Sequence, residues 1–331
     1  MRAVELRAYE GGADSLAVAD KATPKPGEGQ VLVRIHASPI NPSDLSFLRG
    51  AYGIRKKLPV VPGFEASGTV VASGGGVWAN HIVGRRVACA APANGDGTWA
   101  EFMLADAAFC IPLARGTDLE DAATMIVNPF TAWALLGIAA ESRARAVVQT
   151  AAASALGRMI QRLATARGVE VVNVVRRREQ VELLKSEGAR HVLDSSEEEF
   201  DERLKEVCKR LSATVAFDAV AGELTGRVLR AMPADSECVV YGALSMEGCV
   251  LDPRSLIFDR KSVRGFWLSE WMRRTSALKK FAASRSVQKH LKDELRTEIR
   301  ARLPLEQAAE GVRLYERDMT GGKILLLGAR D

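Results

Sequence analysis

The chain has 331 residues, which fits two domains of roughly 100–200 residues each. Hydrophobic residues make up 47% of the chain, and its five cysteines include no CxxC pair, so we expect reduced thiols. The sequence has no signal-peptide core and no apolar run of the roughly 18 residues that span a membrane. We therefore expect a cytoplasmic protein. The net charge of +5 would suit nucleic acid or phosphorylated ligands equally, but the basic residues are not gathered in one block, so nucleic acid is not the expected partner.

Residues 1–122 have the pattern of a β domain. Short apolar runs alternate with glycine and proline, which favours strands joined by irregular loops. The expected strands are Gln30–His36, Gly68–Ala72, Arg86–Ala90 and Glu101–Leu104. After these strands the pattern becomes helical. We expect a helix from Leu119 to Thr124 and a second one that begins at Pro129.

From residue 123 to residue 264 short apolar strands alternate with helices. The expected strands are Ala146–Gln149, Val169–Val175, His191–Leu193, Ala213–Val220 and Cys238–Tyr241, and the expected helices are Ala155–Arg167, Arg178–Glu187, Glu197–Leu211 (capped by Ser195 or Ser196) and Gly222–Met232. Such alternation indicates a parallel sheet covered on both faces. We therefore predict an α/β protein in which residues 123–264 form a doubly wound dinucleotide-binding domain.

Residues 265–331 are too few for a third domain and are expected to return to the β domain, with a last strand at Lys323–Leu327. The basic stretch from Arg273 to Arg300 has apolar residues at roughly helical spacing. It is predicted to be a solvated helical face, because no aromatic residues interleave with its charges to stack on bases.

The first turn from strand to helix is rich in small residues, Thr150 to Gly157. It keeps only Gly157 of the glycine-rich pattern, but alanine and serine also let a pyrophosphate approach the backbone N–H groups at a helix N-terminus. Simple packing of helix on sheet would explain the same residues.

The second strand ends in three arginines. An acidic residue about 20 positions after the glycine turn binds the ribose of NAD, but this sequence has Arg176, Arg177 and Arg178 there. A guanidinium at that strand end can bind a 2′-phosphate in bidentate fashion. The sequence therefore favours NADPH over NADH, the alternative being a solvated basic turn.

The cysteines and histidines do not have the spacing of a zinc site, and no metal is expected. The four histidines are His36, His81, His191 and His290. No serine, histidine and aspartate arrangement indicates nucleophilic catalysis either.

The whole chain resembles the medium-chain dehydrogenase/reductase family, which implies a GroES-like, mainly β catalytic domain beside the dinucleotide domain. The resemblance begins with Asn41-Pro42-Ser43-Asp44 and with Gly63 to Gly68. Where zinc-dependent members have a cysteine and a histidine ligand, this sequence has Ile40 or Asn41, and Phe64. This departure points to the zinc-free branch, which contains quinone reductases and 2-enoyl thioester reductases.

Within that branch the sequence is most similar to mitochondrial-type 2-enoyl thioester reductases. The segments that carry this similarity are Asn41–Tyr52, Asn128–Ala132, Ala153–Gly157, Asn173–Arg176, Tyr241–Ala243, Arg254–Phe258 and Arg264–Trp271. The run Gly265-Phe266-Trp267-Leu268-Ser269 with Trp271 is the most specific. Two departures are Ala153, where the family usually has asparagine, and the wholly basic run after Arg176.

The resemblance implies roles for individual residues. Tyr52 would be the catalytic tyrosine, although it could instead order its loop. The residues that would hold NADPH are Asn128, Ala153, Ser154, Ala155, Leu156, Gly157, Arg176, Arg177, Arg178, Tyr241, Gly242, Ala243, Leu244, Phe266, Trp267, Leu268 and Lys323. Trp267 and Trp271 would either line an acyl channel or lie in a core. A homodimer joined through the cofactor domains is also implied.

Three functions follow from these observations. The first is hydride transfer from NADPH to the β-carbon of a trans-2-enoyl thioester carried by CoA or an acyl carrier protein. The second is reduction of a free quinone or enone. The third is a protein without enzymatic activity that binds NADPH or nucleic acid.

Overall fold

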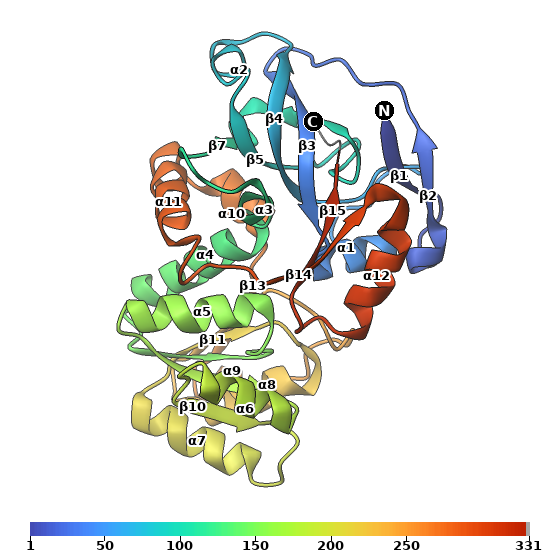
Figure 1. Ribbon diagram of the computed structural model, residues 1–331. Coiled ribbons are helices and arrows are strands. Elements are labelled where there is room, and N and C mark those ends of the chain that lie inside the picture. Colours follow the sequence, from blue (N-terminus) through green and yellow to red (C-terminus); the bar gives the residue numbers. More distant parts are fainter. Residues whose placement is uncertain (329–331) are drawn as a thin grey trace. The chain divides into compact units, whose positions relative to one another are not determined.

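The computed structural model describes residues 1–328 and divides the chain into two compact units (Figure 1). One, called here the β unit, contains residues 1–129 and the part of the chain from residue 284 onward. The other, called here the parallel-sheet unit, contains residues 130–283.

The β unit is built on a seven-stranded sheet whose order is β14, β15, β3, β4, β5, β7, with β6 also paired to β3. The strands are β3 (Gln30–Pro39), β4 (Glu65–Ser73), β5 (Arg86–Ala90), β6 (Phe102–Asp106), β7 (Cys110–Pro112), β14 (Ile299–Pro304) and β15 (Lys323–Leu327). Pairing is antiparallel except between β14 and β15. The last strand, β15, thus pairs with β3 in this sheet.

Short elements surround this sheet. They are the antiparallel pair β1 (Arg2–Leu6) and β2 (Leu16–Asp20), the helices α1 (Pro42–Leu48), α2 (Val77–His81), α3 (Leu119–Ala123) and α12 (Ala308–Arg317), and the 3-10 helices η1 (Gly12–Ser15), η2 (Ala107–Phe109) and η3 (Leu305–Gln307). One hydrophobic core contains Phe47, Trp99 and Tyr315, which are all at most 2% exposed. It therefore packs α1 and α12 on residues from β1 and β15.

The parallel-sheet unit contains six parallel strands in the order β10, β9, β8, β11, β12, β13. They are β8 (Ala146–Gln149), β9 (Glu170–Val175), β10 (His191–Asp194), β11 (Val215–Asp218), β12 (Glu237–Val240) and β13 (Ser262–Gly265). The chain passes from β8 to β9 and β10 on one side and then returns to β11 on the other. This is the doubly wound arrangement that the sequence predicted.

Helices cover this sheet on both faces. They are α5 (Ala155–Ala166), α6 (Arg178–Ser186), α7 (Phe200–Leu211), α8 (Gly222–Ala231) and α9 (Pro253–Ile257). Alternate strand residues point to opposite faces. Val174 therefore packs with α7 and α8, whereas Val175 packs with Leu184 of α6.

Three further helices complete the chain: α4 (Val127–Glu141), α10 (Leu268–Arg274) and α11 (Ala277–His290). Trp271 of α10 packs edge-on against Trp133 of α4, with ring centroids 5.9 Å apart. The sequence placed the boundaries between domains at 122/123 and 264/265, whereas the compact units meet at 129/130 and 283/284. The Trp133–Trp271 contact is one reason that α10 lies with the parallel-sheet unit.

One predicted cap is wrong. The helix expected from Glu197 begins at Phe200 with Glu199 as its N-cap, and neither Ser195 nor Ser196 caps it. The Ser196 hydroxyl instead donates to the Asp194 carboxylate at 2.7 Å, which holds this segment in a turn. The helix predicted at Ala155 begins there, with Ser154 as its cap.

Two glycines of this unit test how tightly α5 packs on the turn before it. A Cβ at Gly157 would lie 2.4 Å from the Ala152 carbonyl oxygen, which cannot move without the backbone, whereas nothing lies within 4 Å of a Cβ at Gly137 in α4. We expect Gly157→Ala to destabilise the fold by about 1–3 kcal/mol, and Gly137→Ala to stabilise it by about 0.5–1 kcal/mol. Midpoints of thermal unfolding measure both, and equal midpoints for the two variants would contradict the packing described.

Candidate active site

The cofactor residues predicted in the parallel-sheet unit all follow the carboxyl ends of its strands. The groups follow β8 (Ala153–Gly157), β9 (Arg176–Arg178), β12 (Tyr241–Leu244) and β13 (Phe266–Leu268). Because the strands are parallel, these four groups lie along one edge of the sheet. The chain changes direction between β8 and β11, and ligands of doubly wound sheets bind at such a point.

Hydrogen bonds between polar groups fix the start of the turn after β8. The Thr150 hydroxyl donates to the Asp218 carboxylate at 2.6 Å and accepts from the Ala219 N–H. Asp218 also accepts from the N–H of Val220 and from the Thr225 hydroxyl. The ends of β8 and β11 are thus tied together at the switch point.

The start of α5 completes this turn. Ala151 has a positive φ of 48°, and the Ser154 hydroxyl accepts from the Gly157 N–H at 3.1 Å. The alanines at 152 and 153 are buried and present no bulky side chain. A helix N-terminus behind such a turn offers N–H groups and a positive dipole end to an anion.

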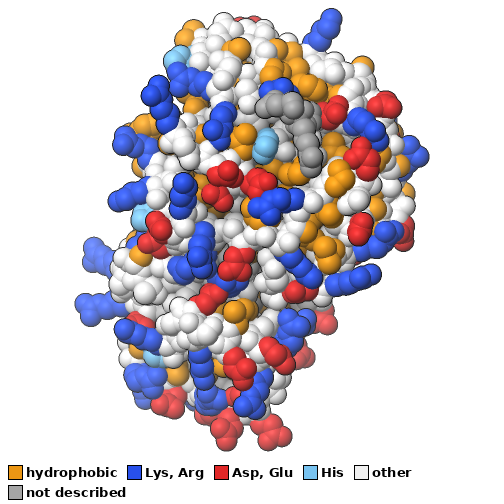
Figure 2. Space-filling model, viewed as in Figure 1, with side chains coloured by type: hydrophobic (Ala, Val, Ile, Leu, Met, Phe, Trp, Pro, Cys, Tyr) orange, Lys and Arg blue, Asp and Glu red, His pale blue; other side chains and the backbone are white. Residues whose placement is uncertain are grey.

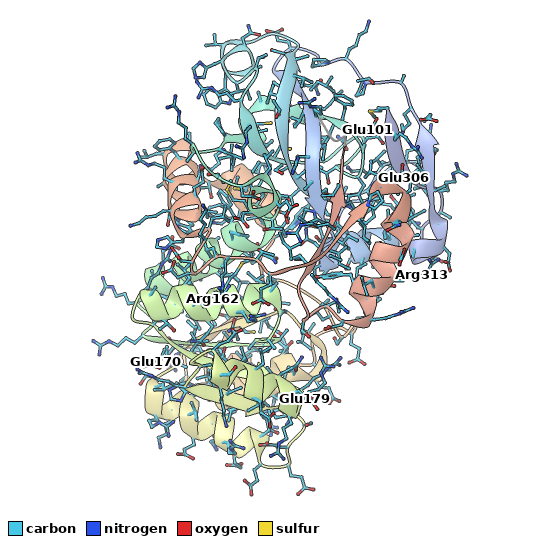
Figure 3. The ribbon with its side chains drawn as sticks, in the orientation of Figure 1. Glu101, Arg162, Glu170, Glu179, Glu306 and Arg313 are labelled. Carbon is cyan, nitrogen blue, oxygen red and sulfur yellow. The ribbon has the colours of Figure 1, made fainter. Side chains whose placement is uncertain are left out.

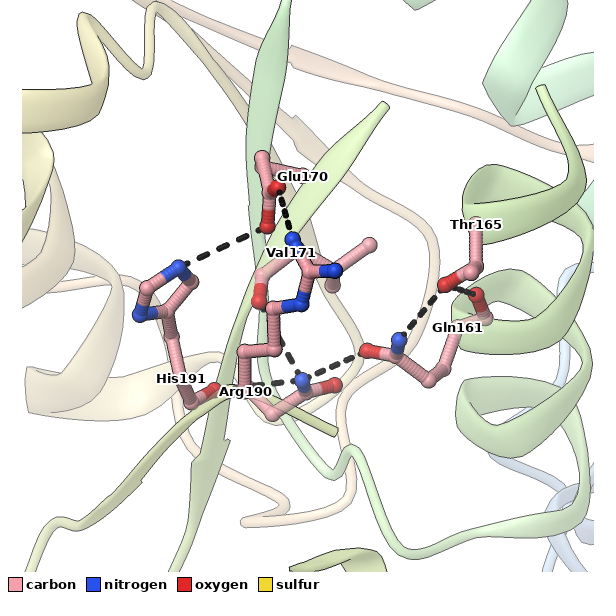
Figure 4. Close-up of polar contacts among 7 residues, drawn as sticks. Gln161, Thr165, Glu170, Val171, Arg190 and His191 are labelled. Atoms are coloured by element: carbon pink, nitrogen blue, oxygen red, sulfur yellow. Dashed lines mark hydrogen bonds and ion pairs between the residues drawn. The ribbon is translucent and has the colours of Figure 1, made fainter. Parts of the chain in front are cut away.

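A buried amide network lies between this turn and β9. Gln149 donates to the Gly157 carbonyl at 3.0 Å and to Asn173 at 2.7 Å. Asn173 donates in turn to Gln161 at 2.6 Å and to the carbonyls of Val171 and His191 (Figure 4). At the far end of the same strand, Glu170 accepts from Arg190 at 3.0 Å. The network joins β8, β9, β10 and α5, so these hydrogen bonds hold the turn after β8 in place.

The three arginines at the end of β9 are exposed. Arg178 lies 3.5 Å from Glu182 one turn further along α6. In the described part of the chain the structure gives the guanidinium groups of Arg176 and Arg177 no carboxylate partner. The first acidic side chain after them, Glu179, is on α6 and is exposed (Figure 3). Two cationic groups are therefore available beside the turn after β8.

The other two groups close the same edge. Tyr241 and Leu244 donate their N–H groups to the carbonyls of Asp218 and Ala219. A Cβ at Gly242 would lie 2.8 Å from the Ala219 oxygen, so a glycine permits this approach of the two loops. Burial raises the pKa of the Tyr241 hydroxyl. Trp267 is 39% exposed.

Two predicted residues, Asn128 and Lys323, lie in the β unit instead. Asn128 is buried in the first turn of α4. The ammonium group of Lys323, also buried, donates to the Asn41 side chain, to the Ile40 carbonyl at 3.2 Å and to the Tyr315 hydroxyl at 3.1 Å. An ammonium group has three donors, so a cofactor contact of Lys323 would have to replace one of these bonds; its role stays a prediction.

Lys323 belongs to a buried polar cluster that the sequence did not predict. The Asn41 side chain donates to Glu65 at 2.9 Å, and the N–H groups of Ile126 and Val127 donate to the other oxygen of Glu65 at 2.8 Å each. Asp44 accepts from the Asn41 N–H at 2.7 Å. The signal available in the sequence was Asn41 with Asp44 three positions on, which is a capping box around Pro42.

Burial alters the acidity of both carboxyl groups. It raises the pKa of Asp44 to about 7, against the lowering effects of the Asn41 N–H and Lys323. It also raises the pKa of Glu65, which the N–H of Val127 and the Asn41 side chain oppose. Asp44 is therefore a buried carboxyl group of raised pKa in the first turn of α1.

Tyr52, the predicted catalytic residue, lies in the loop between α1 and β4. It is half-buried, and its ring packs on Phe64 with centroids 4.8 Å apart. Phe64 in turn meets Phe47 edge-on at 5.7 Å. The Tyr52 ring therefore packs on Phe64, which packs on Phe47. The sequence analysis did not predict these contacts.

These features suit a phosphorylated dinucleotide. The turn after β8 offers donors and little bulk, Gly242 leaves room, and Arg176 and Arg177 can neutralise a phosphate. Among the residues that the structure describes, no group of three or more His, Cys, Asp or Glu could hold a metal ion, and no helix is long and apolar enough to cross a membrane. On the face shown in Figure 2, basic side chains are interspersed with acidic ones.

Two protein-family models match the chain. One, described as the alcohol dehydrogenase GroES-like domain, matches residues 27–115, and one described as zinc-binding dehydrogenase matches residues 155–283. The mitochondrial enoyl-[acyl-carrier-protein] reductase of Caenorhabditis elegans is 31% identical over 261 residues, which are 77% of this chain and 74% of that protein. The Bos taurus reductase of the same name is 34% identical over 74% of this chain and 66% of its own length.

The chain belongs to the medium-chain dehydrogenase/reductase family. Solved structures agree with this assignment. A Mesorhizobium loti protein assigned as an NADPH:quinone reductase is 37% identical, with a TM-score of 0.92 over 99% of this chain and 98% of its own. The quinone oxidoreductase of Thermus thermophilus is 26% identical, with a TM-score of 0.80 over 99% of this chain and 100% of its own. The predicted family, fold class and oxidoreductase activity are thereby confirmed.

Proposed function

We propose that this family member transfers a hydride from NADPH to the β-carbon of a trans-2-enoyl thioester. The observation that carries the proposal is the similarity to enoyl-[acyl-carrier-protein] reductases over about three quarters of the chain, at 31% and 34% identity. The carrier of the acyl chain would be CoA or an acyl carrier protein. Both are anionic, and the chain has a net charge of +5.

NADPH supplies the hydride when it is bound. In this proposal the N–H groups at the start of α5 hold its pyrophosphate, and Arg176 and Arg177 bind its 2′-phosphate. A Thermus quinone oxidoreductase of similar fold has been solved in complex with NADPH, which supports the choice of cofactor. The other predicted contacts, from Asn128, Tyr241–Leu244, Phe266–Leu268 and Lys323, remain part of the same proposal.

Tyr52 would stabilise the negative charge that develops on the thioester oxygen. A tyrosine hydroxyl has a reference pKa of about 10, so it remains protonated at neutral pH and can donate a hydrogen bond to that oxygen. Loss of one such donor typically costs about 10²–10³ in rate. A proton must later reach the α-carbon, and the proposal assigns no residue to that step.

Reduction of a quinone or enone is the second candidate. It is favoured by the similarity to solved structures such as the Mesorhizobium loti protein assigned as an NADPH:quinone reductase. Both candidates use the same cofactor and need no metal. Phe64, and Ile40 or Asn41, which by resemblance stand where zinc-dependent members have their ligands, favour a zinc-free reaction for either substrate.

The oligomer that we propose is a homodimer joined through the parallel sheets. β13 is the edge strand of that sheet, and its side chains are largely exposed. The nearby Leu244 and Val250 are 43% and 56% exposed. Light scattering should give twice the mass of one chain, and the mass of a single chain would contradict a dimer.

The substrate is tested by following the loss of NADPH absorbance with crotonyl-CoA, a longer trans-2-enoyl-CoA and benzoquinone in parallel, with and without a metal chelator. We expect turnover of the enoyl thioesters, unchanged by the chelator, and roughly 10²-fold lower turnover in Tyr52→Phe. Consumption with benzoquinone alone would assign the protein to quinone reduction. Loss of activity in the chelator would overturn the zinc-free reaction.

The cofactor preference is tested by replacing both Arg176 and Arg177 with alanine. Charge-assisted hydrogen bonds contribute about 1.5–3 kcal/mol each, so the KM for NADPH should rise roughly tenfold or more while the KM for NADH stays nearly constant. The double variant Arg203→Ala with Arg210→Ala on α7 removes the same charge elsewhere and should change neither KM. Equal increases for both cofactors in the first variant would refute binding of the 2′-phosphate.

A further inference from the structure

Tyr9 lies against the start of the loop that carries Tyr52 and is hydrogen-bonded to its end. At the start of the loop Gly50 has a positive φ of 70°, and a Cβ there would lie 3.2 Å from the Cβ of Tyr9. At the other end the Tyr9 hydroxyl donates to the Lys56 carbonyl and accepts from the Lys56 N–H, both at 2.8 Å. The loop from residue 50 to residue 56 therefore has two fixed ends.

The side chain of Lys56 strengthens the second attachment. Its ammonium group donates to the carbonyls of Pro92 at 3.1 Å and Gly95 at 2.8 Å. It also lies 6.0 Å from the ring centroid of Phe47, within the range of a cation–π contact. In the middle of the loop, the Tyr52 ring packs on Phe64.

This contact is the first in a row of four aromatic rings. In order, the rings are those of Tyr52, Phe64, Phe47 and Tyr9. The Tyr52 and Phe64 rings are tilted by 41° with centroids 4.8 Å apart, and the next two contacts are edge-to-face at 5.7 Å each. These separations lie in the range where aromatic pairs attract each other. Phe47, the third ring of the row, is buried in the hydrophobic core.

Phe64 is itself rigidly placed. Its carbonyl accepts from the Ala91 N–H at 2.9 Å, and it leads directly into β4. Before it, Gly63 has a φ of 97°, and a Cβ there would lie 2.2 Å from the Thr98 hydroxyl. The ring that faces Tyr52 is thus presented by a backbone that has little freedom to shift.

We infer that Phe64 is a positioning residue for Tyr52: its ring selects the side-chain orientation that places the Tyr52 hydroxyl for catalysis. The inference rests on the proposed role of Tyr52 and adds to it the residue that sets its geometry. A displacement of about 1 Å at a reacting group can cost 10²-fold in rate. Replacement of the Phe64 ring by a smaller apolar side chain should therefore lower kcat while the KM for NADPH stays constant.

The first experiment needs no activity. The chain has four tyrosines, so the protein labelled with 3-fluorotyrosine should give four fluorine NMR signals, and Tyr52→Phe identifies the Tyr52 signal by its loss. Phe64→Leu should shift the Tyr52 signal and leave those of Tyr241 and Tyr315 in place. A Tyr52 signal that does not move would overturn the inference, whatever the protein catalyses.

The second experiment measures turnover with the substrate that the wild-type enzyme reduces. Phe64→Leu should lower kcat roughly ten- to a hundredfold, Phe64→Tyr should restore most of it because a ring is retained, and Phe109→Leu, a partly exposed ring outside the row, should have no effect. In a Tyr52→Phe background the same Phe64→Leu change should cost less than twofold. Independent, multiplicative losses would show that Phe64 does not act through Tyr52 and would overturn the inference.

The two experiments separate the possible failures. If Tyr52→Phe leaves kcat unchanged, the proposed role of Tyr52 fails and with it the catalytic part of the inference, even when the fluorine signal moves. If Tyr52→Phe lowers kcat but Phe64→Leu does not, the role of Tyr52 stands and the positioning role of Phe64 is overturned. Thermal unfolding of each variant checks that a lower kcat does not come from loss of the fold.

Discussion

Parallel pairing of β8 to β13 is the constraint on which the proposed cofactor site depends. Four loops that are separated along the chain by up to about a hundred residues end at one edge only because their strands run in the same direction. The amide network of Gln149, Asn173 and Gln161 and the Thr150–Asp218 bond then join neighbouring strands beneath that edge. A phosphate group needs hydrogen-bond donors in fixed positions. These buried hydrogen bonds fix the backbone of the turn after β8, whose N–H groups are the proposed donors.

The β unit contains several buried charged groups. Glu65 and Asp44 are inside it, and the hydrogen bonds of Asn41 and the ammonium group of Lys323 compensate them. A buried charge without partners would be strongly unfavourable. By resemblance, this sequence has Phe64, and Ile40 or Asn41, where zinc-dependent members of the family have their ligands. We propose that Phe64 has acquired a different task, the support of Tyr52.

Local signals in the sequence were sufficient for most elements of the parallel-sheet unit. Ser154 followed by a helical pattern located the start of α5, and apolar strands located β8 and β9. The failures have physical causes. Ser196 bonds to Asp194 and so does not cap α7. The bond from Lys323 to Asn41 joins residues 282 positions apart, and no local pattern records such a contact. The Tyr52–Phe64 ring contact was missed for the same reason, since only the folded loop brings these rings together.

The central claim is that this chain passes a hydride to the β-carbon of an enoyl thioester. The most direct measurement uses NADPH carrying deuterium at both C4 positions, with crotonyl-CoA as substrate and mass spectrometry of the butyryl product. We expect one deuterium per product molecule, located at the β-carbon. A product without deuterium at that carbon, or no product at all while quinones are reduced, would contradict it.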